Sequence, residues 1–212
     1  MKYPNANIAA VVLSFLFVTG CFNLTELIQP PLEVHLYTLE YTSPAIKAGP
    51  QANFVIGIDE FTTAPNYATR DMIYKKKDFL VAEYIYHRWQ IPPAKMVSYL
   101  LERDMRSAEL FKGVYGCDNL TRTDVVVEGC VDKFLENDTT DDWQAELALH
   151  ITLRDVTAAT AADSILLQRQ YEASQPCDRN HPRAFAGAMS LAMERLSAAI
   201  IEDVHTVLMV RE

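Results

Sequence analysis

Hydrophobic and polar residues alternate most regularly in the second half of the chain, from Trp143 to Arg154. One side of this segment has Trp143, Ala145, Leu147, Leu149, Ile151 and Leu153, and the other has Gln144, Glu146, His150, Thr152 and Arg154. This period of two predicts a half-buried antiparallel strand. Residues 123–134 and 165–171 are also rich in β-forming side chains, so the block 123–173 is predicted to be a meander or a pair of hairpins.

Shorter extended patterns occur in the first half of the chain. Strands are predicted over residues 34–40, 53–59, 70–75, 79–86 and 110–115. Segments 70–75 and 79–86 would form a hairpin, because the polar stretch Lys75–Asp78 lies at their junction. The lysines of that stretch are the only basic run in the sequence, and a solvated turn accounts for them.

Two segments have the spacing of helices. After Ile91-Pro92-Pro93, apolar residues recur every three or four positions to about Ala108, and proline is tolerated in the first turn of a helix. A longer helical pattern runs from about His181 to Met209, with Asn180 as its N-cap. Residues 34–212 are therefore predicted to form a single α/β domain with antiparallel hairpins and two main helices packed against the sheet.

The first residues predict an export signal. Lys2 precedes an apolar run over Ile8–Val18, which has the length of a signal-peptide core and is short for a membrane span. The run ends in Val18-Thr19-Gly20-Cys21, which resembles a bacterial lipobox. Residues 1–20 are therefore predicted to be a lipoprotein signal peptide, and Cys21 the site of lipid attachment, palmitate included. An ordinary secretory signal with a coincidental cysteine, or an uncleaved anchor, would give the same apolar run.

The residues after Cys21 bear on the destination of the chain. Phe22 stands where an aspartate would resemble the usual inner-membrane retention signal of enteric bacteria. We therefore expect the chain to be anchored in the outer membrane of a Gram-negative bacterium and to face the periplasm. Residues 21–33, with Pro30-Pro31, are predicted to be a short tether.

Composition and motifs exclude several functions. The chain has 212 residues, with 19 Lys and Arg against 28 Asp and Glu, for a formal charge of -9. This charge excludes nucleic-acid binding and by itself suits anionic lipid headgroups poorly. No GxSxG, HExxH, Walker or GxGxxG motif occurs, and the five histidines are scattered. We therefore expect a non-enzymatic chain with no catalytic residue, no metal and no cofactor.

Three cysteines remain if Cys21 is lipidated, and the predicted compartment is oxidising. Cys117 and Cys130 could form a disulfide, which would close a loop of about 14 residues and contribute roughly 3 kcal/mol. Cys177 would then be left without a cysteine partner, and its pairing with Cys117 or Cys130 instead stays open. No CxxC pair or Cys/His cluster is present, so a zinc or redox site is not expected.

A cluster of aromatic and basic residues lies at a predicted strand-to-helix junction. The segment Tyr84-Ile85-Tyr86-His87-Arg88-Trp89 is followed by Ile91-Pro92-Pro93. These residues could form an aromatic core cluster, with Trp89 buried and Arg88 paired with an acid. Alternatively, Tyr84, Tyr86, Arg88 and Trp89 could bind a protein partner, because Tyr, Trp and Arg dominate protein–protein hot spots.

Several segments occur in an order that is similar to a known family. Besides the lipobox they are Tyr37-Thr38-Leu39, Val55 to Phe61, Tyr67, Arg70 to Tyr74, Tyr84 to Trp89 with Pro92-Pro93, and Phe111 to Val114. The chain thereby resembles the ABC-type transport auxiliary lipoproteins, the PqiC/YmbA-like group, over about residues 33–210. The most specific segment is Tyr84–Trp89. The cysteine pair at 117 and 130 is not a feature of that family.

The resemblance implies a mixed sheet with helices packed against it and a non-catalytic role. Such lipoproteins accompany an ABC ATPase, a permease and an MCE-domain protein that reaches across the periplasm, and these systems move lipids or other apolar compounds between the two membranes. The implied partner is the MCE-domain protein, and a homo-oligomer is compatible with the sequence. A stand-alone carrier that binds lipid or an apolar ligand, and an envelope-structural lipoprotein, are the alternatives.

Overall fold

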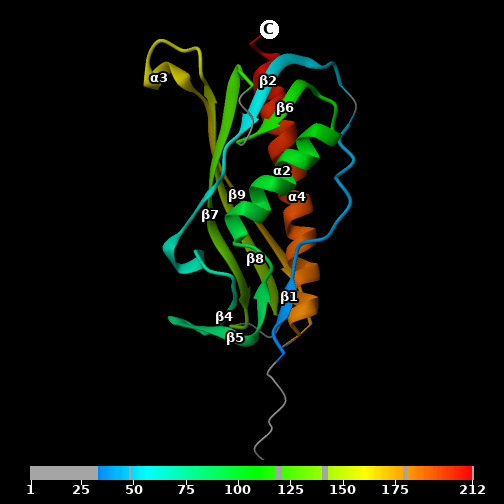
Figure 1. The fold of residues 1–212 in the computed structure, drawn as a ribbon, viewed down its shortest axis with the longest axis vertical. Helices are drawn as coiled ribbons and strands as arrows, with labels where there is room; N and C mark the ends of the chain where they lie inside the picture. Colours follow the sequence, from blue (N-terminus) through cyan, green and yellow to red (C-terminus); the bar gives the residue numbers. More distant parts are fainter. Residues whose placement is uncertain (1–32, 48, 118–120, 140–142, 179–180, 212) are drawn as a thin grey trace, which may run out of the picture. The chain divides into compact units, whose positions relative to one another are not determined.

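The computed structural model describes residues 33–47, 49–117, 121–139, 143–178 and 181–211. The predicted signal peptide, the lipobox with Cys21 and nearly all of the tether lie outside these residues. Residues Val34–Glu212 form one compact unit. It is a mixed α/β domain, as predicted, with nine strands in one curled sheet (Figure 1).

Strand β7 (Val125–Asn137) is the centre of the sheet. Strand β8 (Gln144–Asp155) pairs with it in antiparallel fashion along its whole length, and β9 (Ile165–Pro176) pairs in the same way with β8. The predicted meander is therefore confirmed. Its cause is the alternation from Trp143 onward: all six apolar residues on that side of β8 are buried, whereas His150 and Thr152 on the other side are only partly covered.

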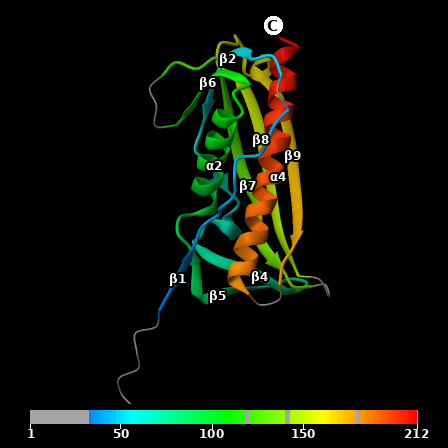
Figure 2. The ribbon, with the colours of Figure 1, turned by 90° about the vertical axis from the view of Figure 1, so that its right-hand side faces the viewer.

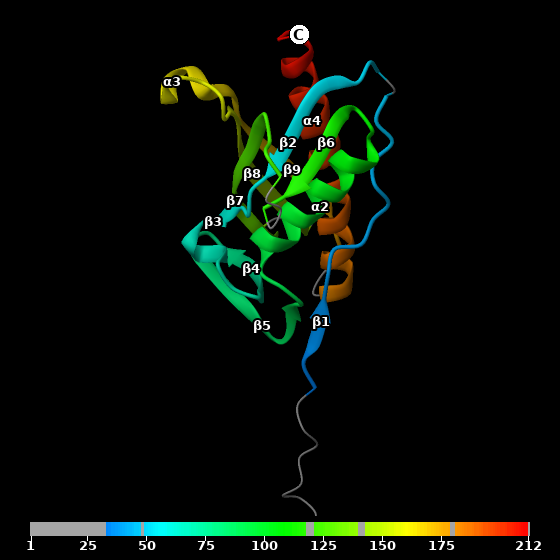
Figure 3. The same ribbon diagram turned by 45° about the horizontal axis from the view of Figure 1, so that its top comes forward.

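The other edge of β7 is shared by three short strands that run parallel to it. They are β2 (Ala52–Ile58), β3 (Thr62–Thr63) and β4 (Asp71–Lys77). Strand β6 (Phe111–Gly116) extends the sheet beyond β2. At the other end of β7, β5 (Leu80–Trp89) and β1 (His35–Tyr37) extend it beyond β4 (Figure 3). The β4–β5 hairpin is thus held at one end of the domain.

Two long helices cover one face of the sheet (Figure 2). Helix α2 (Pro93–Ser107) packs mainly on β6, and α4 (Pro182–Met209) packs on β8, β9 and α2, as the periodicities predicted. The N-cap of α4 is His181, whose side chain accepts a hydrogen bond from Ala184 N, and Asn180 lies outside the described residues. Helix α4 has the length and hydropathy of a membrane span, but 61% of that window is buried, as expected for a core helix.

Local differences from the predicted elements have clear causes. Strand β1 is shorter than the predicted strand 34–40, because Glu40 N donates a hydrogen bond to Ser190 Oγ on α4 and the chain leaves the sheet. Between the predicted strands 53–59 and 70–75 the structure has β3 and a 3₁₀ helix, η2 (Pro65–Tyr67). The small-residue turn before β9 ends in a short helix, α3 (Ala161–Ser164), whose N-cap Thr160 accepts from Asp163 N.

Candidate functional site

The four residues predicted to bind a partner all lie on β5, but they do not share one surface. Trp89 is fully buried and contacts Phe134 and Phe185 in T-shaped geometry, with ring centroids 5.1 and 5.5 Å apart. It therefore joins β5, β7 and α4 in the core. Because its side chain is not exposed, Trp89 cannot contact a partner in this conformation. The interpretation of Trp89 as a core residue therefore holds.

Tyr84 is half-buried and holds β5 to the sheet. Its hydroxyl donates a hydrogen bond of 2.6 Å to Oε2 of Glu136, a fully buried carboxyl group on β7. The thiol of Cys177 lies 3.8 Å from the other oxygen, Oε1. This cluster places Cys177 against a carboxylate, although its sequence position gave no indication of a partner.

Burial controls the protonation of this cluster. It raises the pKa of the Glu136 carboxyl, and the hydrogen bonds from Tyr84 and Cys177 oppose that rise only in part. Burial, followed by the hydrogen bond to Glu136, raises the pKa of the Tyr84 phenol. Burial and the charge of Glu136 raise the pKa of Cys177 to about 12. Cys177 is therefore held as a thiol, which makes it a poor nucleophile.

Tyr86 and Arg88 are the accessible members of the predicted set. Nε of Arg88 lies 2.9 Å from Oδ1 of Asp71 on the neighbouring strand β4, and half of the arginine side chain is exposed. The β4–β5 ladder is irregular next to this pair, between Asp71 and Ile73. The irregularity coincides with the exposure of Ile85, which is 74% accessible. Tyr86 and Arg88 thus provide an aromatic and a cationic group on the outer edge of the domain.

Strand β1 completes this edge. It pairs in parallel with the end of β5, so that Leu36 lies opposite Arg88 and His35 opposite His87. The two imidazole rings stack with centroids 5.3 Å apart, and the Tyr37 hydroxyl is hydrogen-bonded to Nδ1 of His87 at 3.1 Å. Burial and the neighbouring His35 lower the pKa of His87. The exposed residues of this edge, Leu36, Tyr86 and Arg88, are the candidate partner surface.

The hairpin has a further exposed apolar group beyond the residues predicted to bind a partner. Phe79 is fully exposed in the turn between β4 and β5, and Leu80 and Val81 follow it with about half of their surface in solvent. Three consecutive apolar residues beside the lysine run were a visible signal. The predicted strand over residues 79–86 includes all three, and the structure leaves each of them exposed at the tip of the hairpin.

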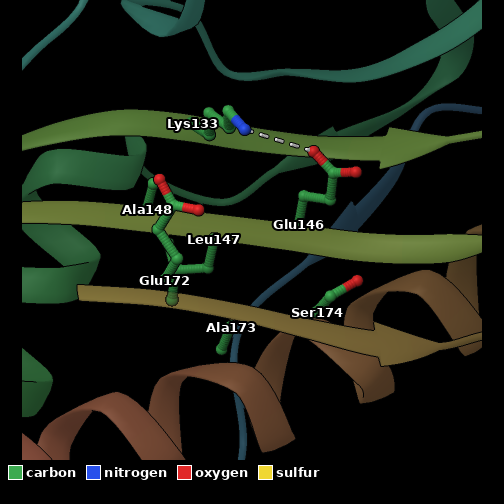
Figure 4. Close-up of a pocket in the computed structure, with 7 residues that line it drawn as sticks. All are labelled: Lys133, Glu146, Leu147, Ala148, Glu172, Ala173 and Ser174. Atoms are coloured by element: carbon green, nitrogen blue, oxygen red, sulfur yellow. Dashed lines mark ion pairs between the residues drawn. The ribbon is translucent and has the colours of Figure 1, made fainter.

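Pockets formed by the described residues are small and open to solvent. One of about 260 Å³ lies on β7, β8 and β9, and its lining includes Lys133, Glu146 and Glu172 (Figure 4). Lys133 Nζ is 3.7 Å from Glu146 Oε2, so these charges pair with each other. Another, of about 280 Å³, lies between η2 and the hairpin, beside Tyr67 and Val81. Within the described residues, no group of three or more His, Cys, Asp and Glu could hold a metal ion.

The predicted Cys117–Cys130 disulfide is not formed in the structure, where Cys130 is a thiol. Cys117 follows β6, Cys130 lies within β7, and β2 pairs with both strands between them. The strand beside Cys130 is β3, through Thr62, and not β6, which precedes Cys117. The spacing along the chain permitted the bridge, but the sheet does not place the two cysteines on neighbouring strands.

Comparisons with known proteins agree with this fold. The sequence model of the ABC-type transport auxiliary lipoprotein component matches residues 37–201. The structure is similar to the crystal structure of protein XCC0632 from Xanthomonas campestris, of the family DUF330, with a TM-score of 0.71 and 14% identity over 81% of this chain and 95% of that chain. A crystal structure of an uncharacterized protein matches with a TM-score of 0.63 and 11% identity over 81% and 99%. The comparison with curated proteins finds no match.

Proposed function

This chain belongs to the family of ABC-type transport auxiliary lipoproteins, and on that premise we propose that it is a non-catalytic subunit of an MCE-type system that moves lipids or other apolar compounds between two membranes. In this role it is anchored in the outer membrane through Cys21 and docks the periplasm-spanning MCE-domain protein. The observation that carries the proposal is the family match over residues 37–201, which includes most of the described domain.

The N-terminal sequence supports the anchor. The lipobox provides a cysteine at position 21, and β1 begins at His35, so a short connection joins the lipid to the domain. Several acyl chains give stable anchoring, because each buried CH₂ contributes about 0.8 kcal/mol and a single chain binds only marginally. Phe22 favours the outer membrane.

The edge formed by β1 and β5 supports the docking role. An exposed tyrosine and a half-exposed arginine lie there beside Leu36, and tyrosine and arginine are among the residues that dominate the energetics of protein interfaces. The core anchor Trp89 holds β5 in place beneath them. Tyr84 contributes by positioning the strand through Glu136. We therefore assign the partner contact to Tyr86 and Arg88, and the support of that contact to Tyr84 and Trp89.

Affinity capture tests the proposal. The tagged full chain is expressed in its native envelope, crosslinked, purified and analysed by mass spectrometry. Recovery of an MCE-domain protein with its permease and ATPase is the expected result. Recovery of bound lipid without those proteins would instead favour a stand-alone carrier, and a complex that contains only this chain would indicate a homo-oligomer.

A further inference from the structure

The tip of the β4–β5 hairpin presents an aromatic ring to solvent. Strand β4 ends at Lys77, β5 begins at Leu80, and Phe79 lies in the turn with its whole side chain exposed. Its φ of 64° is in the left-handed region, which glycine and asparagine adopt more easily than a bulky aromatic residue. Neither packing against the described residues nor backbone geometry therefore explains a phenylalanine at this position.

The same tip concentrates positive charge on an acidic protein. From Asp71 to Trp89 the hairpin has four basic and three acidic residues, whereas the whole chain has a formal charge of -9. Lys75 contacts Asp78 at 3.1 Å and Lys76 lies over the ring of Tyr74, which leaves Lys77 as an exposed cation beside Phe79. Basic residues next to exposed apolar side chains are the composition that binds the surface of anionic bilayers.

The hairpin lies at the same end of the domain as β1, the first strand. Strand β1 starts at His35 and pairs with the end of β5, and Figures 1 and 2 both show β1, β4 and β5 together at that end, opposite the C-terminal end of α4. Glu33 is twelve positions after Cys21. A chain of that length spans at most about 40 Å, so a lipid on Cys21 would keep β1 and this end of the domain within about that distance of the bilayer.

We propose that the hairpin tip, residues 75–81, binds the surface of a phospholipid bilayer that contains anionic lipid. Phe79 and Leu80 enter the headgroup region, and Lys77 faces the lipid phosphates. The acidic remainder of the domain is repelled by the same surface, so the contact is confined to the tip and orients the domain. This inference rests on the anchored state of the proposed function and adds a second contact with the membrane.

Fluorescence quenching tests the contact directly. A Phe79→Trp variant of the full, anchored chain is bound to vesicles of phosphatidylethanolamine and phosphatidylglycerol. Lipids with brominated acyl chains quench tryptophan emission, and the extent of quenching reports how deeply the tryptophan enters the bilayer. The native Trp89 and Trp143 are buried and give a constant background. We expect the emission of the tryptophan introduced at position 79 to shift to shorter wavelength and to be quenched several-fold more strongly than the background.

A matched control uses Val210, which is also exposed but lies at the end of α4 away from the hairpin (Figure 1). Val210→Trp is expected to show neither the shift nor the quenching. Equal and weak quenching at positions 79 and 210, with the protein still on the vesicles, would overturn the proposal. A shift of the position-79 emission to shorter wavelength that depends on protein concentration, and not on lipid, would overturn the proposal in favour of contact with a second copy.

The anchor is measured separately, so that its failure can be distinguished. The mass of the purified chain shows whether Cys21 has acyl chains. If it has none, the anchor of the proposed function is wrong, and the same two tryptophan variants are attached to vesicles through an N-terminal histidine tag and nickel-chelating lipid. Quenching at position 79 in that arrangement supports the hairpin contact, and its absence contradicts it.

Discussion

Ser197 on α4 donates a hydrogen bond of 2.7 Å to Oδ2 of Asp104 on α2, and Asp104 is almost completely buried. The hydroxyl of Tyr41 donates to the same oxygen at 2.7 Å, and Nε of Arg103 donates to Oδ1 at 2.9 Å. One carboxylate therefore joins both helices to the loop that follows β1. Burial, followed by the hydrogen bond to Asp104, raises the pKa of the Tyr41 phenol.

Asp104→Ala is predicted to destabilise the domain by about 3 kcal/mol, because three donors lose their acceptor in the core. Ser197→Ala removes one donor and is expected to cost about 1 kcal/mol. Urea unfolding measures both free energies. A loss for Asp104→Ala no larger than that for Ser197→Ala would contradict the central role of this carboxylate.

Glu136 predicts a specific pH dependence of stability. Its folded pKa is raised above its ordinary value of 4.5, so the folded state holds the proton more tightly than the unfolded state. The stabilisation that this tighter proton binding gives the folded state is fully present below the pKa of Glu136 in the unfolded state. It is lost as pH rises through the pKa of Glu136 in the folded state. Glu136→Gln should remove that slope and leave the stability at neutral pH equal or higher. A variant with an unchanged slope in unfolding experiments from pH 4 upward would contradict this assignment.

Phe79→Gly is predicted to stabilise the isolated domain by about 1 kcal/mol. Glycine adopts a positive φ without strain, and removal of the exposed ring costs the domain no packing contacts. Glu109 has a φ of 55° and provides a matched substitution, Glu109→Gly, away from the hairpin. Thermal unfolding checks both. If Phe79→Gly lowered the melting temperature, the ring would have to pack against the domain.

Gly129 on β7 is expected to tolerate no side chain. A Cβ there would overlap Cε2 of Phe61, a buried ring, so Gly129→Ala should cost about 2 kcal/mol through overpacking. Gly187 on α4 has open space where a Cβ would lie, with no atom within 4 Å, and Gly187→Ala should stabilise by up to about 1 kcal/mol. Chemical denaturation of the pair measures the contrast, and equal effects would refute it.

The sequence predicts those parts of the fold that depend on local periodicity. Strand β8 and helices α2 and α4 follow from apolar spacing alone, and the structure confirms them. The order of strands around β7 depends on pairings between distant segments, for which the pattern has no signal. For this reason the spacing of Cys117 and Cys130 along the chain permitted a bridge, whereas the sheet places β3, and not β6, beside Cys130.

The candidate site shows the same division. The motif Tyr84–Trp89 was visible in the sequence, and so was the choice between a core and a partner role. The structure divides it, because Trp89 is buried whereas Tyr86 and Arg88 are exposed. The contact of Tyr84 with Glu136 joins residues 52 positions apart, and only the folded sheet brings them together.

Affinity capture of the full chain from its crosslinked native envelope tests the transport role most directly. The wild-type chain is expected to recover an MCE-domain protein with its permease and ATPase. The paired substitutions Tyr86→Ala and Arg88→Ala should reduce that recovery by about tenfold or more, as expected for hot-spot residues, while the melting temperature changes little. Leu191→Ala, at an exposed position on α4, serves as the control. Capture of the wild-type chain without any of these proteins would contradict its role as a subunit of such a system.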